Sequence, residues 1–288
     1  MQYRISHTTT YRYSKPVKLR PHILRLCPRN DGSQWLQSFA ATISPTPTQQ
    51  THCLDANGHI CQKVSFDQPL ETLEIHTESV VTTTRDNPFD YLAEPWAIAF
   101  PIDYPSSLAM QLRPYWEPPI GWGVNDAIAP EVVALAHDLL QATNQNVGLF
   151  LTQLTQLIPQ QCSYQQRLEG MPYPAAVTLA KQVGTCRDFT VLFMAVCRAV
   201  GLAARFVSGY QEGDLAQASH DLHAWAEVYV PGGGWRGFDP TLGLAVSDRH
   251  VAISAAVDPQ QAAPVSGTLQ PAQQVETNLE TQIKLVST

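Results

Sequence analysis

A helix that begins at a cysteine constrains the fold of this chain more than any other sequence feature. Apolar residues recur at helical spacing after Cys186, and Gly201 supplies a stop signal, which predicts a helix from Thr185 or Cys186 to about Val200. The apolar positions are Phe189, Leu192, Phe193, Val196 and Val200. Such a stripe is buried against another element, so the helix is expected to hold Cys186 rigidly at its N-terminus.

Three strands are predicted directly after this helix, over residues 203–210, 224–230 and 235–239. The glycine-rich segment 231–234 turns the last two strands into a hairpin. A helix followed by antiparallel strands indicates that this half of the chain is α+β.

The N-terminal third has a different pattern. Residues 3–81 form short stretches rich in Thr, Val, Ile and aromatic residues, separated by polar turns, as is typical of an antiparallel β-sandwich-like domain. The many prolines between 85 and 126 argue against extended helices or strands there. Two further helices are predicted over 130–142 and from 147 to about 157.

The C-terminal stretch 259–274 is poor in apolar residues and is expected to wrap the surface, whereas 282–286 alternates as a last strand does. We therefore expect four segments, which are an N-terminal β-domain (1–84), a structured connector (85–128), an α+β core (129–258) and a C-terminal wrap with a final strand (259–288).

Composition excludes several partners. With 288 residues, 44% of them hydrophobic, the chain can bury a substantial core. A formal charge of −7 provides no concentrated basic surface, so neither nucleic acid nor a membrane is expected as a partner. The N-terminus lacks a secretory signal and no stretch is long enough to span a bilayer, which predicts a cytoplasmic protein. The six cysteines are expected to be free thiols.

Cys186 is the candidate nucleophile. A thiol attacks as the thiolate, which the N-terminus of a helix and a neighbouring imidazolium both stabilise. The N–H groups of the first helical turn, including that of Cys186, are candidate donors to an oxyanion. The alternative is a small buried residue, which is our interpretation of Cys197 on the same helix.

His223 and Asp239 are the candidate base and orienting acid. His223 begins a predicted strand and Asp239 ends the next, so the hairpin can bring them together. The alternatives are a structural histidine and a turn aspartate, with His220 as a competing base. A four-residue loop would place Asp239 on the strand face opposite His223, so the triad requires an odd loop or a β-bulge.

The residues around these three positions resemble those of a known family. The matching segments are Gly184-Thr185-Cys186-Arg187-Asp188-Phe189, Ala204 to Tyr210, His223-Ala224-Trp225-Ala226-Glu227, and Gly234 to Thr241. Together they resemble the transglutaminase-like core of bacterial proteins over about residues 147–255. The segment with Tyr11-Arg12-Tyr13 and Leu24-Arg25-Leu26-Cys27-Pro28-Arg29 is similar to the β-domain that precedes this core in the same proteins.

The resemblance implies a papain-like fold without cofactor or metal, acyl transfer through a thioester, and a peptide or protein substrate. It implies a cysteine peptidase or amidase, with Asp188 bracing the first helical turn and Trp225 supporting His223 from the same strand face. Tyr164 is a candidate oxyanion donor. Relatives usually have Gly-Arg-Asp where this chain has Ala256-Val257-Asp258, so one arginine contact is in doubt.

Three alternatives stay open from the sequence. An amine instead of water as acceptor would make the protein a cross-linking transglutaminase with the same catalytic residues. A binding module that keeps the fold without activity is a second alternative. A zinc site is the third, and its candidate ligands are His52, Cys53, His59 and Cys61. A two-residue turn at 57–58 would point Cys53 away from the other three, which argues against it.

Overall fold

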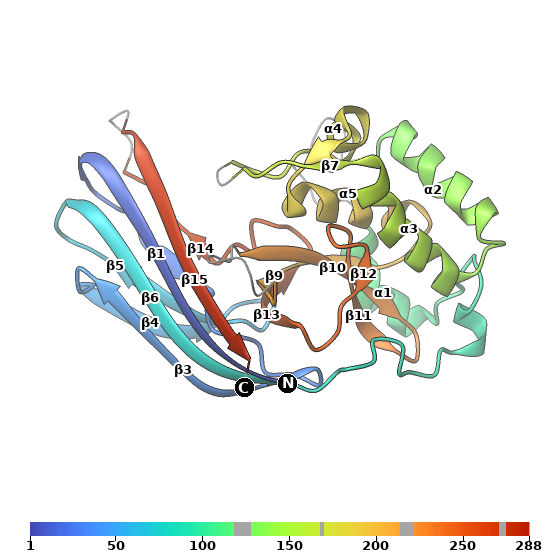
Figure 1. Ribbon diagram of the computed structural model, residues 1–288, viewed down its shortest axis with the longest axis horizontal. Helices are drawn as coiled ribbons and strands as arrows, with labels where there is room; N and C mark the ends of the chain where they lie inside the picture. Colours follow the sequence, from blue (N-terminus) through green and yellow to red (C-terminus); the bar gives the residue numbers. More distant parts are fainter. Residues whose placement is uncertain (118–127, 168–169, 214–221, 271–274, 288) are drawn as a thin grey trace.

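The computed structural model describes residues 1–117, 128–167, 170–213, 222–270 and 275–287 (Figure 1). Its N-terminal part consists of two four-stranded antiparallel sheets with the strand orders β15-β1-β6-β3 and β14-β2-β5-β4. The strands are β1 (Gln2–Val17), β2 (His22–Leu24), β3 (Gln34–Ser44), β4 (Gln49–Leu54), β5 (Ile60–Ser65), β6 (Leu70–Thr83), β14 (Val265–Ser266) and β15 (Thr277–Ser287). Each sheet thus takes one strand from the C-terminal end of the chain.

Buried and exposed side chains alternate along these strands, so the two sheets pack face to face as a sandwich. In β1, Tyr3 and Ile5 are buried while Arg4 between them is exposed. They belong to one hydrophobic cluster with Leu24 of β2 and Val64 of β5, so apolar residues of both sheets fill the space between them. The predicted α+β fold with an N-terminal β-sandwich-like domain is confirmed.

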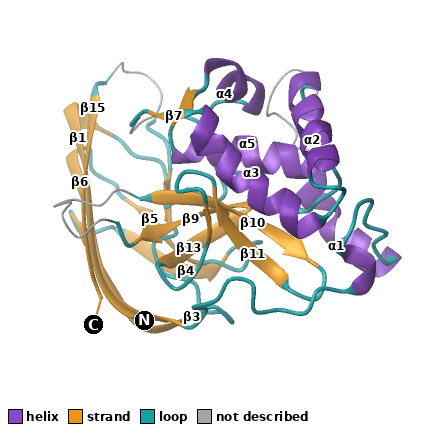
Figure 2. Cartoon of the chain, turned by 45° about the vertical axis from the view of Figure 1, so that its right-hand side comes forward, coloured by secondary structure: helices purple, strands orange, loops and turns teal. Residues whose placement is uncertain are grey.

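The core is a five-stranded antiparallel sheet with helices on one side. Its order is β12-β11-β10-β9-β13. The strands are β9 (Ala204–Gln211), β10 (His223–Val230), β11 (Gly234–Asp239), β12 (Leu244–Ala245) and β13 (His250–Ala256). Figure 2 shows the helices gathered on one face of this sheet, with the N-terminal sheets beyond the other.

The helices with clear local signals lie where they are predicted. Helix α2 (Pro130–Ala142) starts with proline at its first position, where no N–H is needed. Helix α3 (Val147–Gln161) begins as predicted and runs one turn further, and α5 (Cys186–Ala199) ends just before Gly201, whose φ is +81°. A short helix α4 (Ala175–Lys181) precedes α5.

The connector contains a helix that its prolines argued against. Helix α1 (Ser106–Trp116) and the 3-10 turn η1 (Pro95–Ala97) lie within it, so the expectation of no extended helix is wrong. Pro105 stands just before α1 and Pro114 lies in its last turn, which leaves eight proline-free residues between them to form the helix. Residues 118–127 of the connector lie outside the described residues.

The N-terminal sandwich and the core share their packing. Val251 and Ile253 of β13 and Tyr210 of β9 belong to the same hydrophobic cluster as the sandwich. Gln34 of β3 accepts a hydrogen bond from the backbone N–H of Ala252 (2.7 Å) and donates one to its carbonyl (2.9 Å). The two parts therefore pack as one body.

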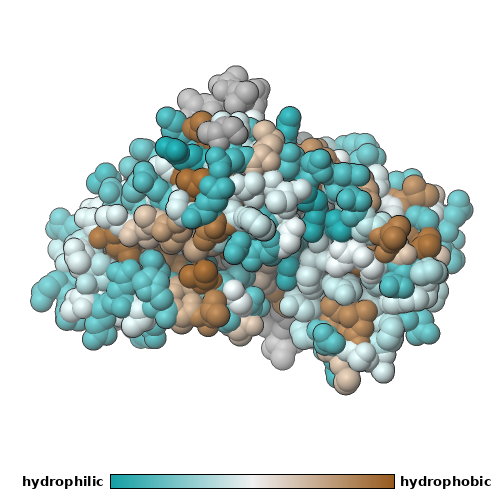
Figure 3. Space-filling view, turned by 90° about the horizontal axis from the view of Figure 1, so that it is seen from below, coloured by the Kyte–Doolittle hydropathy of each residue, from teal (hydrophilic) through white to brown (hydrophobic). Residues whose placement is uncertain are grey.

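The surface carries no extended apolar face in the view of Figure 3, where hydrophobic residues form separate patches. Within the described part of the chain, no helix has the length and apolar character needed to cross a membrane.

Candidate active site

Cys186 is the first residue of α5, and Thr185 precedes it as the N-cap residue. The cysteine is 8% exposed and lines a pocket. The first N–H groups of a helix have no partner within it and point toward its N-terminal end, where Cys186 lies. Their partial positive charge favours an anion at this end, such as a thiolate or the oxyanion of a tetrahedral intermediate.

Asp188 braces this first turn. Its carboxylate accepts hydrogen bonds from the backbone N–H (2.7 Å) and the hydroxyl (3.0 Å) of Thr185. It also accepts from the Arg167 guanidinium (2.7 Å) and from the backbone N–H of Tyr173 (2.6 Å). Burial alone would raise the pKa of Asp188, but these hydrogen bonds lower it. A Cβ on Gly184 would meet the Asp188 Cβ at 2.8 Å, so glycine permits this close approach.

Tyr164 lies beside the turn that leads into α5. It pairs with Gly184 across the short parallel sheet of β7 (Ser163–Tyr164) and β8 (Val183–Gly184). Tyr164 is 54% exposed and lines the same pocket as Cys186 and His223. Its hydroxyl stays a candidate oxyanion donor.

The hairpin between β10 and β11 has the odd loop that the triad requires. Val230 pairs with Gly234, so the loop consists of three residues, 231–233, and the next pairs follow without a bulge to Ala226 and Phe238. One step further along this register Asp239 faces residue 225, on the strand face that also carries His223. A four-residue loop would have put Asp239 on the opposite face.

Glycine is required within this loop. Gly232 has a φ of +85°, and a Cβ there would collide with the backbone carbonyl of Leu92. The close packing of the connector against the loop therefore helps to fix the register that orients Asp239.

His223 and Asp239 form a buried pair. The distance from His223 Nε2 to Asp239 Oδ2 is 2.6 Å, and Asp239 is fully buried. Its other oxygen, Oδ1, accepts from the backbone N–H groups of Thr241 (2.9 Å) and Leu242 (3.1 Å). The carboxylate is thus fixed by backbone on one side and binds the imidazole on the other.

The charge of this pair follows from its surroundings. Burial alone would lower the pKa of His223, but the Asp239 carboxylate outweighs it, and a hydrogen bond with Cys186 adds to the effect, so the pKa rises to about 10. Burial would raise the pKa of Asp239, yet His223 and His250 hold it well below its ordinary value. Since Nε2 faces Asp239, Nδ1 is the ring nitrogen left for the thiol. At neutral pH the site therefore contains an imidazolium next to Cys186.

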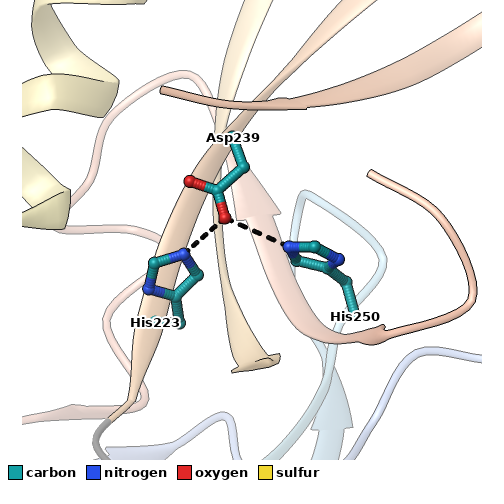
Figure 4. Close-up of side chains that lie close together, drawn as sticks. All are labelled: His223, Asp239 and His250. Atoms are coloured by element: carbon teal, nitrogen blue, oxygen red, sulfur yellow. Dashed lines mark hydrogen bonds and ion pairs between the residues drawn. The ribbon is translucent and has the colours of Figure 1, made fainter. Parts of the chain in front are cut away.

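A second histidine binds the same oxygen of Asp239, which sequence reasoning missed. Figure 4 shows His223 and His250 on either side of Asp239 Oδ2, and the distance to His250 Nε2 is 3.1 Å. His250 is buried, and burial lowers its pKa despite the nearby carboxylate, so it is neutral and donates an N–H. The signal in the sequence was weak, because His250 begins a strand eleven residues after Asp239 with no motif between them.

Trp225 supports both histidines. Its ring is 1% exposed and lies edge-on to His250, with ring centroids 5.2 Å apart, and 6.3 Å from the His223 ring. The contacts of this buried ring with both imidazoles help to hold them beside Asp239.

The pocket over these residues is built from distant parts of the chain. It has a volume of about 180 Å³. Tyr164 and Arg167 line it from the segment before α4, Ser208 from β9, and Leu222 from the residue just before β10. Its remaining wall comes from the C-terminal segment, through Pro264, Leu279 and Thr281. The pocket therefore borders both the core and the N-terminal sandwich.

The candidate zinc ligands are not gathered. The turn between β4 and β5 has five residues, 55–59, so the two-residue turn expected there is wrong, and Cys53 lies directly opposite Cys61. His59 Nδ1 instead pairs with Asp55 (2.9 Å), and its Nε2 accepts from the backbone N–H of Ala255 (2.8 Å). Among the described residues, the one group that could hold a metal by its geometry is His223, Asp239 and His250, whose nitrogens already face a shared oxygen.

Two other candidates need comment. His220, the competing base, lies outside the described residues. Cys197 is fully buried, and burial raises the pKa of its thiol, which agrees with a structural thiol on the far part of α5. All six cysteines are free in this structure.

Arg198 contacts the segment in which relatives have Gly-Arg-Asp and this chain has Ala256-Val257-Asp258. Arg198 of α5 donates to the carbonyl of Val257 (3.2 Å) and to that of Ala204 (2.9 Å). Asp258 lies near enough to raise the pKa of Arg198, although burial dominates and lowers it to about 10. Arg198 thus ties α5 to the backbone of this segment and of β9.

Comparison with known families matches two regions of the chain. Residues 3–82 match the bacterial transglutaminase-like N-terminal region, and residues 133–240 match the transglutaminase-like superfamily. The second region contains Cys186, His223 and Asp239.

Relatives and solved structures agree with these matches. An uncharacterized protein of Mycobacterium tuberculosis is 29% identical over 283 residues, which cover 93% of this chain and 87% of that protein. A protein-glutamine gamma-glutamyltransferase of Pseudomonas aeruginosa is 31% identical over 125 residues, 40% of this chain and 19% of that protein. The structure of a proposed cysteine protease from Cytophaga hutchinsonii has the same fold, with a TM-score of 0.74 at 20% identity, and covers 100% of this chain and 91% of its own.

Proposed function

The chain joins a bacterial transglutaminase-like N-terminal region to a core of the transglutaminase-like superfamily, whose members are cysteine-dependent enzymes, and on this premise we propose that it hydrolyses a peptide or carboxamide bond through a thioester on Cys186. The observation that carries the proposal is the buried His223–Asp239 pair at 2.6 Å, in a pocket that Cys186 and His223 line together.

The first half-reaction forms the thioester. The Cys186 sulfur attacks the substrate carbonyl carbon, and the carbonyl oxygen becomes an oxyanion at the N-terminus of α5. The imidazolium of His223 then gives its proton to the leaving nitrogen as the C–N bond breaks, which releases an amine or ammonia. His223 is left neutral, and Asp239 keeps its ring oriented.

The second half-reaction regenerates the enzyme. Neutral His223 takes a proton from water as the water oxygen attacks the thioester carbon. The C–S bond breaks and releases a carboxylic acid, and Cys186 and His223 return to their starting charges. A primary amine in place of water would give an amide, which is the cross-linking reaction suggested by the name of the Pseudomonas aeruginosa relative.

The first experiment tests the nucleophile without a known substrate. Iodoacetamide at mildly acidic pH reacts slowly with ordinary thiols, and peptide mass spectrometry measures each cysteine separately. Cys53 is exposed and provides an internal reference. We expect Cys186 to be alkylated faster than Cys53. It should lose this advantage in His223→Ala but not in the control His76→Ala, which lies in β6 of the N-terminal sheet.

Two outcomes would count against the proposal. Labelling of Cys186 no faster than that of Cys53 in the wild type would favour a non-catalytic binding module. Fast labelling followed by products that contain an added primary amine, with no free acid, would favour the transglutaminase reaction. The second outcome is read by incubating glutamine-containing peptides with and without the amine and comparing the product masses.

A further inference from the structure

The strand β15 lies between β1 of the N-terminal sheet and the pocket that contains Cys186. It is the edge strand of the sheet β15-β1-β6-β3, at the side nearer the core in Figure 1. Its residues Leu279 and Thr281 also line the pocket that contains Cys186 and His223. An edge of the N-terminal sheet therefore forms one wall of the candidate active site.

The hydrogen bonds of β1 show which backbone groups of β15 face outward. Ser14 donates its backbone N–H to the carbonyl of Glu276 (3.0 Å), one step beyond the last paired residues of the ladder. In an antiparallel pair, residues that exchange hydrogen bonds alternate with residues whose N–H and C=O point the other way. Leu279 and Thr281 are of the second kind, so their backbone groups point away from β1.

The other side of β1 agrees with this assignment. Thr83 donates its N–H to the carbonyl of Met1, so odd-numbered residues of β1 bond to β6 and even-numbered ones to β15. In the part of the chain that the structure describes, no strand pairs with the outer side of β15. Leu279 and Thr281 are both half-buried, with side chains on the face that carries buried Ile283.

We infer that an extended segment of the polypeptide substrate binds along the free edge of β15 as an additional strand and so brings its scissile carbonyl to Cys186. The inference rests on the proposed function and specifies its substrate class, an unfolded or extended polypeptide rather than a small amide. Peptide backbone is the ligand that an open row of N–H and C=O groups fits, as in other cases of strand addition.

The residues that line the pocket indicate which side chains of a bound strand are preferred. Alternate residues of a bound strand point to the same face as Leu279 and Thr281. One of them would lie against Leu222, Pro264 and Leu279, which are apolar. We therefore expect a preference for an apolar residue near the scissile bond, and little discrimination at the residues on either side of it.

A variant of one backbone group tests the inference. Thr281→Pro removes an N–H that points to the free edge and leaves the hydrogen bonds to β1 in place. An edge strand tolerates proline at such an outward-facing position. Ala41→Pro is the matched control. Ala41 has the same outward orientation on β3, the opposite edge of the sheet, because even-numbered residues of β6 bond to β3. Thr281→Val changes the side chain and keeps the N–H, so it measures what the side chain alone contributes.

The readout is the rate at which Cys186 is alkylated by two reagents. One is iodoacetamide, and the other is an extended tetrapeptidyl chloromethyl ketone, from which the thiolate displaces chloride. The rate with the peptide reagent divided by the rate with iodoacetamide measures how much peptide binding accelerates the alkylation. A change in the reactivity of Cys186 itself affects both rates equally and cancels in this ratio. We expect Thr281→Pro to lower this ratio about tenfold, as for the loss of one or two hydrogen bonds. Ala41→Pro should retain the ratio, and Thr281→Val should lower it much less than Thr281→Pro does.

The possible results separate the two proposals. Slow iodoacetamide labelling of Cys186 in the wild type overturns the proposed function, whatever the peptide does. Fast iodoacetamide labelling with an equal ratio in Thr281→Pro and Ala41→Pro overturns the role of β15 alone. A wild-type dimer in light scattering that becomes a monomer in Thr281→Pro also overturns it, because a second copy would then occupy the edge.

Discussion

Replacing Glu227 by glutamine should destabilise the protein strongly and in a pH-dependent way. Glu227 lies in β10, is 6% exposed, and accepts hydrogen bonds from Arg29 (2.8 and 3.2 Å) and Arg205 (2.7 Å). The glutamine has the same shape but no charge, so two guanidinium groups lose their shared counterion. Breaking a buried ion pair on one side typically costs about 3–5 kcal/mol.

The pKa of Glu227 gives an independent value for the same interaction. Burial alone would raise this pKa, but Arg205 and Arg29 lower it from 4.5 to about 2. A difference of about 2.5 pH units corresponds to about 3 kcal/mol at neutral pH. Because the folded-state pKa is the lower one, this stabilisation is present above about pH 4.5 and is lost as the pH falls toward 2. About 2 kcal/mol of it should remain at about pH 3.5.

Urea unfolding followed by tryptophan fluorescence measures both effects, since Trp235 stacks on Arg205 at 4.2 Å. Wild type and Glu227→Gln are compared at neutral pH and at about pH 3.5, where the gap between them should shrink by about 1 kcal/mol. Glu78→Gln is the control, because Glu78 is exposed and should change stability by less than about 0.5 kcal/mol. A gap that is small at neutral pH, or the same at both pH values, would refute the reasoning.

Three further changes test the site. Asp239→Asn should lower turnover about 10³- to 10⁴-fold, as kinetics on a peptide substrate would measure. Without the carboxylate, burial alone acts on His223 and lowers its pKa. The alkaline limb of the pH–rate profile should therefore move from about pH 10 to below 6.5. His250→Ala should lower kcat by about tenfold with little change in KM, whereas His250→Gln, which keeps a donor for Asp239, should restore part of it. Gly184→Ala should lower stability by about 1–3 kcal/mol in thermal unfolding, because its Cβ would meet that of Asp188.

Local signals allowed α2, α3 and α5 to be predicted, and with α5 the position of the candidate nucleophile Cys186. The N-terminus of α5 follows from Thr185 and from the apolar spacing after it, and its end follows from Gly201. The contact between His223 and Asp239 could be predicted from the sequence only in part. The sequence required an odd loop, but whether 231–234 forms a three- or a four-residue loop depends on Gly232 packing against the connector, which is a tertiary contact.

Contacts between distant segments could not be derived from pattern. Arg29 and Glu227 each stand in a segment that resembles the family, yet nothing in either segment says that they meet. The same is true of His250, whose only signal would have been the carboxylate it shares with His223. Helix α1 was not predicted because the number of prolines in the connector argued against a helix. Their positions allow one, since Pro105 precedes the helix and Pro114 lies in its last turn.

The N-terminal sandwich has a direct consequence for the active site. β15 belongs to that sheet through its pairing with β1, and Leu279 and Thr281 reach the pocket only because this pairing holds the strand beside the core. The bonds of Gln34 to Ala252 and of Arg29 to Glu227 in turn fix the sandwich against β13 and β10. In the proposed reaction the core supplies the reacting groups, and the sandwich supplies the wall along which an extended chain would lie. Changes at the Arg29–Glu227 contact should therefore alter the reaction with peptide reagents more than the reaction of Cys186 with iodoacetamide.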